Sequence, residues 1–166
     1  YHVRPGYLKK PFRIFKFRSM LNKYNNGNKL SSEEERITSF GKFLRNSSLD
    51  EMPSLINIFR GEMSFVGPRP LVMEYLPHYS REQAKRHNVK PGLTGLAQVN
   101  GRNDTTWEER LNFDCKYVAK KSFLMDLKII LKTIWKVIIK RESNNRIMPP
   151  FANAKITDKY FNSNLP

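Results

Sequence analysis

The sequence of 166 residues is poor in the side chains that build disulfides and transition-metal centres. It contains one cysteine, Cys115, and three histidines that stand far apart. One thiol cannot form a disulfide within the chain, and no two histidines have the spacing of metal ligands. We therefore expect neither a disulfide framework nor a histidine or cysteine metal site. We interpret Cys115, which lies in an apolar-polar stretch, as a buried structural thiol.

Long apolar runs are also missing. No stretch of about eighteen uninterrupted apolar residues occurs, so the sequence predicts no helix that spans a bilayer. The chain starts at Tyr1, and no charged-then-apolar leader follows it. We therefore expect the chain to be a fragment or a processed form of a longer protein.

Acidic residues are scarce relative to basic ones. The chain has 15 Asp and Glu against 30 Lys and Arg, which gives a net charge of +15 and a pI near 10.1. Such a field attracts polyanions, whether nucleic acid, anionic lipid headgroups or phosphorylated small molecules. Charge alone does not choose among these three classes of partner.

The local patterns predict short elements. Alternating aromatic residues favour a strand over residues 12–18, and a short apolar run favours another over 96–99. Pairs with capping-box spacing predict three helix starts, at Ser32 and Glu35, Ser80 and Gln83, and Thr105 and Glu108. We predict a mixed α/β fold, a small irregular domain of short helices with few strands. Residues 1–142 would form this domain, and residues 143–166 a poorly ordered tail.

The longest predicted helix, residues 122–141, combines a lysine stripe with a broad apolar face. Lysines recur at every fourth position, and a tryptophan lies among the leucines and isoleucines: Lys128, Lys132, Trp135, Lys136 and Lys140. This pattern suits an amphipathic helix at a membrane interface. It equally suits a core helix with a solvated lysine edge, and the sequence leaves both readings open.

Two adjacent carboxylates, Asp50 and Glu51, precede an apolar helix that ends at Gly61. We interpret Asp50 as the N-cap of this helix, where the helix dipole favours ionised carboxylates. An ionised Asp is a potential nucleophile, and a neighbouring Glu offers hard oxygen ligands to a divalent cation such as Mg²⁺. Acidic residues in a first turn are also ordinary caps, so the pair alone indicates little.

The basic residues around this pair favour a phosphate site. Lys16 lies on the predicted strand, Arg45 lies five residues before Asp50, and Arg69 stands between Pro68 and Pro70. Two prolines make a stiff loop that presents one arginine. Cations around a carboxylate pair are what an attack on a phosphoanhydride requires, because the phosphate charge must be neutralised.

Several strings of residues together resemble the bacterial sugar transferase family, the monotopic polyprenyl-phosphate phosphoglycosyl transferases. The resemblance runs from Arg4 to about Arg141. It rests on PFRIFKFRSM at 11–20, SLDE at 48–51, GEMSFVGPRP at 61–70, RHNVKPGLTGLAQVNGR at 86–102 and SFLMDLK at 122–128. The resemblance implies that family members begin with a hydrophobic re-entrant membrane helix, and we expect residues 1–166 to start in the part that normally follows that helix.

The resemblance implies an enzyme and a mechanism. Asp50 would attack the β-phosphate of a UDP-sugar, release UMP and carry the sugar phosphate covalently until undecaprenyl (polyprenyl) phosphate accepts it. Glu51 would bind Mg²⁺, Lys16 and Arg45 would contact the phosphates, and Arg69 would belong to the nucleotide-side loop. The product would initiate glycan, capsule or exopolysaccharide biosynthesis at the cytosolic face of the bacterial inner membrane.

Two other classes of function remain as alternatives. A basic nucleic-acid-binding module would explain the net charge of +15, but no recognisable nucleic-acid motif occurs, so we expect no nucleic acid partner. A catalytically inactive membrane scaffold would not explain the carboxylate pair beside Arg45. Within the enzyme class, the alternative substrate is the hexose-1-phosphate type found at the end of longer, multi-span relatives.

Overall fold

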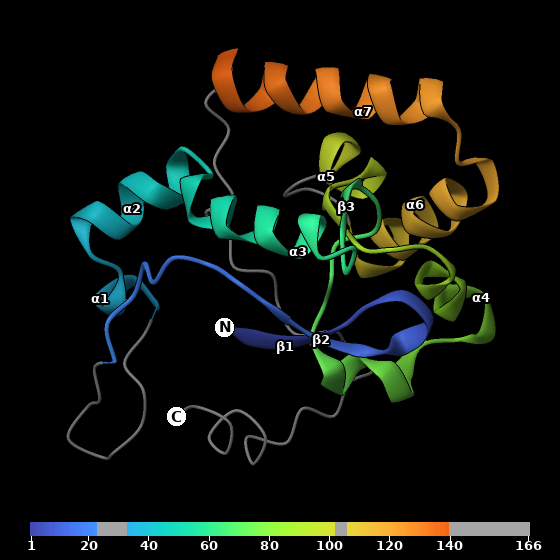
Figure 1. Cartoon of the computed structure of the whole chain (residues 1–166), viewed down its shortest axis with the longest axis horizontal. Helices are drawn as coiled ribbons and strands as arrows, with labels where there is room; N and C mark the ends of the chain where they lie inside the picture. Colours follow the sequence, from blue (N-terminus) through green and yellow to red (C-terminus); the bar gives the residue numbers. More distant parts are fainter. Residues whose placement is uncertain (23–32, 102–105, 140–166) are drawn as a thin grey trace.

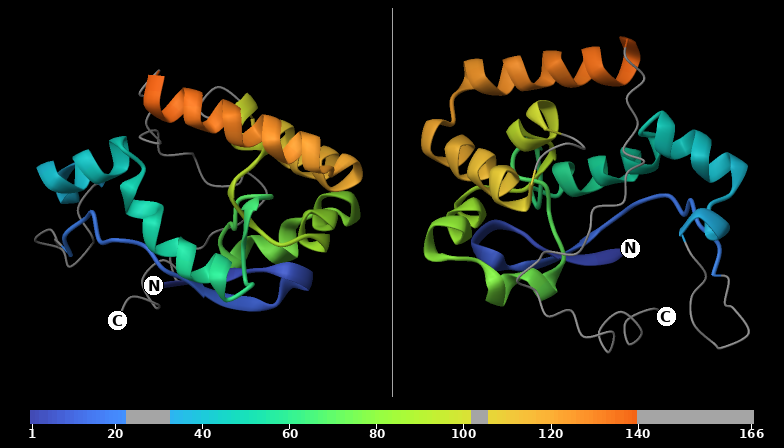
Figure 2. Two further views of the ribbon diagram at one scale, coloured as in Figure 1. Left: turned by 45° about the horizontal axis from the view of Figure 1, so that its top comes forward. Right: turned by 180° about the vertical axis from the view of Figure 1, so that it is seen from behind.

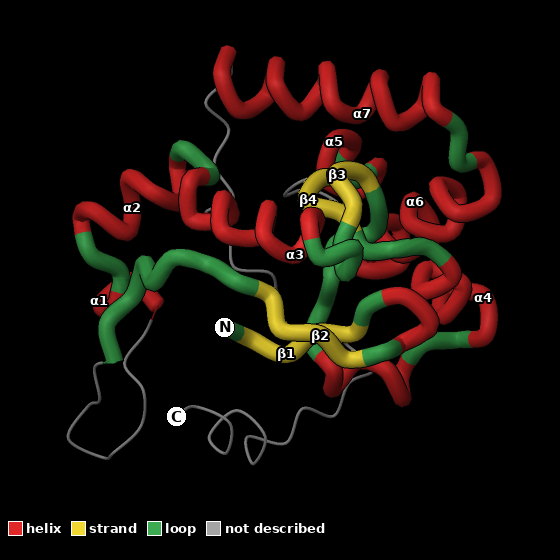
Figure 3. Tube along the Cα trace, viewed as in Figure 1, coloured by secondary structure: helices red, strands yellow, loops and turns green. Residues whose placement is uncertain are grey.

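The computed structural model describes residues 1–22, 33–101 and 106–139. Short helices make up most of this part of the chain, and its strands form two small sheets (Figures 1 and 3). The predicted mixed α/β class, with short helices and few strands, is confirmed. The α-helices are α1 Glu33–Arg36, α2 Ser39–Asn46, α3 Leu55–Phe59, α4 Arg81–Ala84, α5 Leu96–Asn100, α6 Trp107–Lys120 and α7 Phe123–Ile134. The 3₁₀ helices are η1 Tyr7–Lys9, η2 Leu49–Ser54, η3 Met73–His78 and η4 Lys85–Asn88, and α7 continues as a π-helical turn, η5 Trp135–Ile139.

The first sheet is shorter than the sequence predicts. Strands β1 (His2–Pro5) and β2 (Pro11–Ile14) pair antiparallel, so the strand expected over residues 12–18 ends at Ile14. Beyond it, the backbone bonds to helical elements instead of a strand. The Phe15 amide donates to Asn57 Oδ1 at 3.2 Å, and the Phe17 amide donates to the Asp50 carbonyl at 3.0 Å. Lys16 therefore lies on an extended segment beside η2 and α3.

The second sheet pairs β3 (Ser64–Val66) with β4 (Gly92–Thr94) in parallel. The strand predicted at 96–99 is wrong: those residues form α5, and the strand lies just before them, at Gly92–Thr94. Glycines explain the close pairing of the two backbones. A Cβ at Gly92 would collide with the Gly67 amide nitrogen, and one at Gly95 would collide with the Gly67 carbonyl oxygen. Only glycine permits so close an approach.

Helix starts follow the capping chemistry, with shifts of position. Ser80 and Gln83 form the predicted capping box of α4. At α6 the box is Thr106 with Glu109, one residue later than predicted. Thr38 caps α2 by accepting from the Gly41 amide. Ser32 and the tail 143–166 lie outside the described residues.

Helix α7 lies along one side of the molecule and covers α5 and the second sheet (Figures 1 and 2). Its inner side enters the main core through Ile129, which is packed with Val66, Val99 and Tyr117. Its outer side remains apolar as well: Leu124, Leu127, Leu131, Ile134 and Trp135 are between 42% and 66% exposed. In the described residues, no helix has the length and apolarity needed to span a bilayer.

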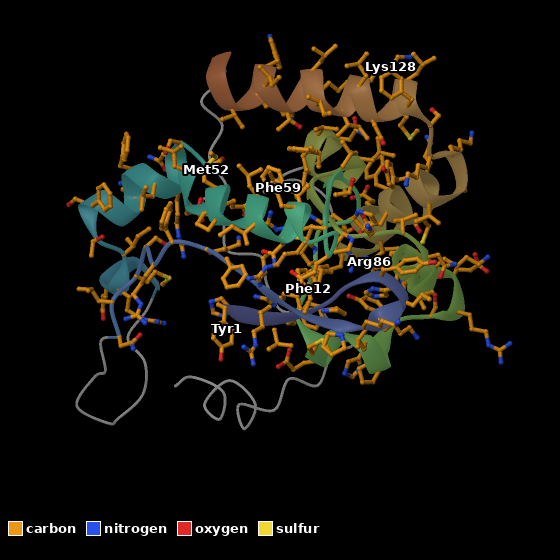
Figure 4. All side chains as sticks on the ribbon, viewed as in Figure 1. Tyr1, Phe12, Met52, Phe59, Arg86 and Lys128 are labelled. Carbon is orange, nitrogen blue, oxygen red and sulfur yellow. The ribbon has the colours of Figure 1, made fainter. Side chains whose placement is uncertain are left out.

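The interpretation of this helix as a core helix is confirmed at Ile129, and its position at a membrane interface stays a prediction. Ile129 behaves as a core residue. Lys128 and Lys132 are exposed beside the outer apolar strip, and Figure 4 shows Lys128 projecting from α7 away from the rest of the domain. Lys140 and Arg141 lie outside the described residues.

Candidate active site

A left-handed residue starts the turn that carries the two carboxylates. Ser48 has φ of 57° and is the residue before η2, so the prediction of Asp50 as the N-cap is wrong. Asp50 and Glu51 lie in the first turn of η2, which leads directly into α3. A non-glycine residue with positive φ is uncommon and costs about 1 kcal/mol or more, which the surrounding contacts must offset.

Two buried polar side chains hold the extended segment of Lys16 against this turn. Ser54 donates through Oγ to the Phe15 carbonyl at 2.9 Å. Asn57 Nδ2 donates to the Arg13 carbonyl and to Glu62 Oε2, each at 2.7 Å. Both side chains are fully buried, at 0% exposure. Because satisfied buried hydrogen bonds fix backbone register, these contacts place Lys16 opposite Glu51.

Glu51 is the electrostatic centre of the site. Its Oε1 accepts from Lys16 Nζ at 2.7 Å and from Arg69 NH2 at 2.7 Å. Burial raises the pKa of the Glu51 carboxyl, but Arg69 and Lys16 outweigh this effect and lower the pKa to about 2. Glu51 therefore stays ionised at any physiological pH.

Asp50 differs sharply from its neighbour. It is half-buried, and its pKa is raised by burial and by the charge of Glu51, against the opposing effects of Lys16, Arg69 and Arg45. The expectation that the helix start favours ionisation of both carboxylates is thus wrong for Asp50. Burial and, after it, repulsion from the ionised Glu51 raise the pKa of Asp50.

Arg45 contributes a positive charge to the site. Its Nε donates to Ser19 Oγ at 3.0 Å, and NH2 contacts Met20 Sδ at 2.8 Å. These contacts hold the guanidinium of Arg45, which belongs to α2, against residues 19 and 20 of the chain. Its positive charge favours the ionised form of Asp50.

The loop that presents Arg69 is supported by a buried ion pair that the sequence analysis missed. Arg86 NH2 donates to the Arg69 carbonyl at 2.7 Å, and Arg86 also donates to Asp114 Oδ2 from Nε at 3.0 Å and from NH2 at 2.8 Å. The two side chains are 1% and 6% exposed. Figure 4 shows Arg86 inside the domain. The resemblance included Arg86, but 28 residues separate it from Asp114, and no local pattern joins them.

A cavity of about 340 Å³ opens beside Glu51. Its cationic lining is Arg4, Lys16, Arg69, Arg110 and the paired Arg86. The pKa of Arg4 is lowered by burial and by the Arg69 charge, and the pKa of Arg110 is lowered for the same two reasons. Arginines that repel one another across a cavity create strong affinity for a polyanion. We name this space the arginine cavity.

Aromatic rings line the same cavity. Tyr75 and Trp107 pack edge to face, with ring centroids 5.5 Å apart and planes at 86°. Aromatic faces near cations suit a ligand that has both a phosphate group and a planar ring. The proximity of these rings to Arg4 and Arg110 depends on the tertiary fold, so no local sequence pattern indicates it.

A second cavity, of about 240 Å³, meets the first at Glu51. Leu93 and Gln98 also line both spaces. Residues of α7 and η5 form one wall of this second cavity. The lining of the cavity is mostly apolar, and we name this space the apolar cavity. The carboxylate of Glu51 therefore lies between a cationic space and an apolar one.

The carboxylates fit a magnesium ion only together with a phosphate ligand. In the described part of the chain, no three histidine, cysteine, aspartate or glutamate side chains come together as a metal site. Glu51 Oε2 has only a distant contact, 3.5 Å from Arg69 NH1, and so retains capacity for a ligand. Mg²⁺ commonly uses one or two carboxylates and completes its shell with waters and substrate phosphates. The donor set thus fits Mg²⁺ bound with a phosphorylated substrate.

Comparison with known proteins identifies the family. A family model described as "Bacterial sugar transferase" matches residues 1–140. The chain is 48% identical over 137 residues to the uncharacterized sugar transferase EpsL of Bacillus subtilis, with 82% of this chain and 68% of EpsL covered. It is 41% identical to the exopolysaccharide production protein ExoY of Sinorhizobium fredii, with 86% and 70% covered. The chain belongs to the bacterial sugar transferase family.

Longer relatives share only this part. The UDP-glucose:undecaprenyl-phosphate glucose-1-phosphate transferase of Escherichia coli is 38% identical over 149 residues. The match covers 84% of this chain and 32% of that protein. Most of this chain therefore corresponds to about a third of that longer protein.

Proposed function

We propose that the protein transfers a sugar-1-phosphate from a UDP-sugar to undecaprenyl phosphate, and that it does so in two steps through Asp50. The main observation that supports this reaction is the position of Glu51. Its ionised carboxylate pairs with Lys16 and Arg69 and lies between the arginine cavity and the apolar cavity. Relatives whose names specify this donor and acceptor type support the substrate class.

In the first step, a carboxylate oxygen of Asp50 attacks the β-phosphorus of the donor. The bond between that phosphorus and the bridging oxygen breaks, and UMP leaves with the bonding electrons. Lys16, Arg45 and Arg69 stabilise the charge of the phosphates, as phosphoryl transfer requires. The raised pKa of Asp50 makes its carboxylate more basic, which favours attack on phosphorus.

In the second step, a phosphate oxygen of the lipid attacks the same phosphorus. The bond from phosphorus to Asp50 breaks, the carboxylate keeps the electron pair, and a polyprenyl diphosphate sugar forms. Glu51 is the residue that would hold Mg²⁺, together with substrate phosphates. Bound there, the ion would neutralise phosphate charge.

We further propose that the protein acts at the cytosolic face of the bacterial inner membrane, with α7 against the bilayer. The exposed strip of Leu124, Leu127, Leu131, Ile134 and Trp135 supplies apolar contact, and Lys128 and Lys132 lie beside it. Interfacial helices combine an apolar face with lysines that reach anionic headgroups.

The experiment uses the full gene product in membranes or nanodiscs, with a panel of UDP-sugars, magnesium and undecaprenyl phosphate. We expect UMP and a lipid-linked sugar to form together. Release of UDP instead of UMP would mean transfer of the sugar without its phosphate, and would contradict the proposal. Without the lipid phosphate, the protein should release no more than about one UMP per molecule, and continued release beyond that amount measures hydrolysis.

A further inference from the structure

The apolar cavity lies between η2, β4, α5 and the end of α7. Glu51 and Ser48 line it on the side of η2, and Ile130, Ile134 and Val137 line it on the side of α7 and η5. The wall on the latter side includes part of a π-helical turn, an irregularity that is frequent at functional sites. Most of the cations and rings that suit a sugar nucleotide line the other cavity, whereas this one is mostly apolar.

The polar end of this cavity has unused hydrogen-bonding capacity. Ser48 Oγ and Gln98 Oε1 are buried and have no hydrogen-bond partner among the described residues. The other amide atom of Gln98, Nε2, donates to the Leu93 carbonyl at 3.1 Å, which fixes the side chain. Buried polar atoms without a partner are rare and costly. Of these two, only the Ser48 hydroxyl can donate to a phosphate, because Gln98 Oε1 is itself an acceptor. Lys136 also lines the cavity and adds a positive charge to it.

The rim of the cavity is apolar and accessible. Met52, Phe65 and Ile134 line the cavity and are 48%, 55% and 48% exposed. Figure 4 shows Met52 on the side of its helix that faces α7. The rim therefore continues into the exposed apolar strip of α7. Such an opening favours entry of a hydrocarbon chain from an apolar phase and gives no benefit to a charged donor from water.

We infer that the apolar cavity binds the isoprenyl units next to the phosphate of the lipid acceptor, with that phosphate bound by the Ser48 hydroxyl and the Lys136 ammonium group. This inference rests on the proposed function and assigns its second substrate to particular residues. Donor and acceptor then approach the same carboxylate pair from two different cavities. The apolar walls select an isoprenoid chain, whereas the arginine cavity selects the nucleotide.

Filling the cavity tests the assignment. In Val137→Trp a large ring replaces a half-buried valine of the wall. Val3→Trp is the matched control, since Val3 lies on β1, is 47% exposed and lines neither cavity. For the full gene product in nanodiscs, we expect Val137→Trp to lower kcat/KM for undecaprenyl phosphate about tenfold or more. UMP release in a single turnover without acceptor should change less than about twofold, and the control should match the parent in both assays.

A second pair of variants keeps the assignment testable if Val137→Trp does not fold. Phe65→Ala removes an exposed ring from the rim, and Phe59→Ala removes a 91% exposed ring that lines neither cavity. We expect only Phe65→Ala to raise the KM for undecaprenyl phosphate.

Either of two results would show that the apolar cavity does not bind the lipid acceptor. Equal losses in the donor and acceptor assays of Val137→Trp, or unchanged acceptor kinetics in both cavity variants, would overturn the assignment. If the parent releases no UMP without acceptor, the two-step route fails instead. Steady-state kcat/KM values for the acceptor and the donor, compared across the same variants, then decide the cavity assignment on their own.

Discussion

Glu51→Gln is the substitution for which the structure gives the clearest magnitude. Glutamine keeps the shape and the acceptor oxygen but removes the charge that pairs with Lys16 and Arg69. In the folded protein the pKa of Glu51 is about 2, against an ordinary value of 4.5. This difference corresponds to about 3 kcal/mol of stability at neutral pH.

The pH dependence follows from the sign of this shift. A depressed pKa contributes stability that is fully present above pH 4.5 and is lost as the pH falls toward 2. The stability difference between the parent and Glu51→Gln should therefore be about 3 kcal/mol at pH 7 and about 1 kcal/mol at pH 3. Comparing the two proteins at each pH cancels the titration of all other groups.

Urea denaturation followed by circular dichroism measures this difference. Glu82→Gln is the matched control, because Glu82 pairs with Lys85 at 2.7 Å on the surface, where its side chain is 75% exposed. Its effect should stay below about 0.5 kcal/mol at both pH values. A Glu51→Gln protein as stable as the parent at pH 7, or a difference that does not change between pH 7 and pH 3, would refute the electrostatic account of the site.

Further predictions concern the support of the loop, the metal and the membrane. Asp114→Asn leaves Arg86 buried without its counter-charge, so we expect a loss of about 3 kcal/mol or more in unfolding free energy and a lower kcat/KM for the UDP-sugar. A variant that is stable and fully active would contradict the supporting role of this pair. Activity should vanish in EDTA and return with magnesium or manganese, and full activity in chelator would exclude a metal role. Replacing the lysine stripe with glutamine should weaken binding to anionic vesicles, by roughly 1 kcal/mol per lysine near the surface, and leave neutral vesicles unaffected. The exchanged residues are Lys128, Lys132, Lys136 and Lys140. Unchanged binding to anionic vesicles would show that another surface attaches the protein.

The sequence predicted the features that depend on neighbouring residues. The capping box of Ser80 and Gln83 has the predicted position, and the carboxylate pair lies at a helical turn beside Lys16 and Arg69. The resemblance to a family supplied the pairing of these distant cations. Periodicity alone offered no reason to bring residues 16 and 69 together.

Long-range hydrogen bonds explain where prediction failed. Residues 12–18 have the alternating pattern of a strand, but beyond Ile14 the Phe15 backbone bonds to the side chains of Ser54 and Asn57 instead of to a neighbouring strand. The different titration of Asp50 and Glu51 depends on Arg69, 18 residues away from Glu51, so no local rule for helix starts separates them. The arginine cavity escaped prediction for the same reason, since Arg4 and Arg110 meet Arg69 only in the folded chain.

The most direct test of the central claim is the intact mass of the protein after brief exposure to its UDP-sugar and magnesium without lipid acceptor. The account predicts an added mass equal to one sugar phosphate, located on Asp50 by peptide mapping. The adduct should be lost when undecaprenyl phosphate is added and should never form in Asp50→Asn, where asparagine leaves the turn intact. Turnover with no adduct on the parent, or an Asp50→Asn protein that works at the parental rate, would contradict the proposed route through Asp50.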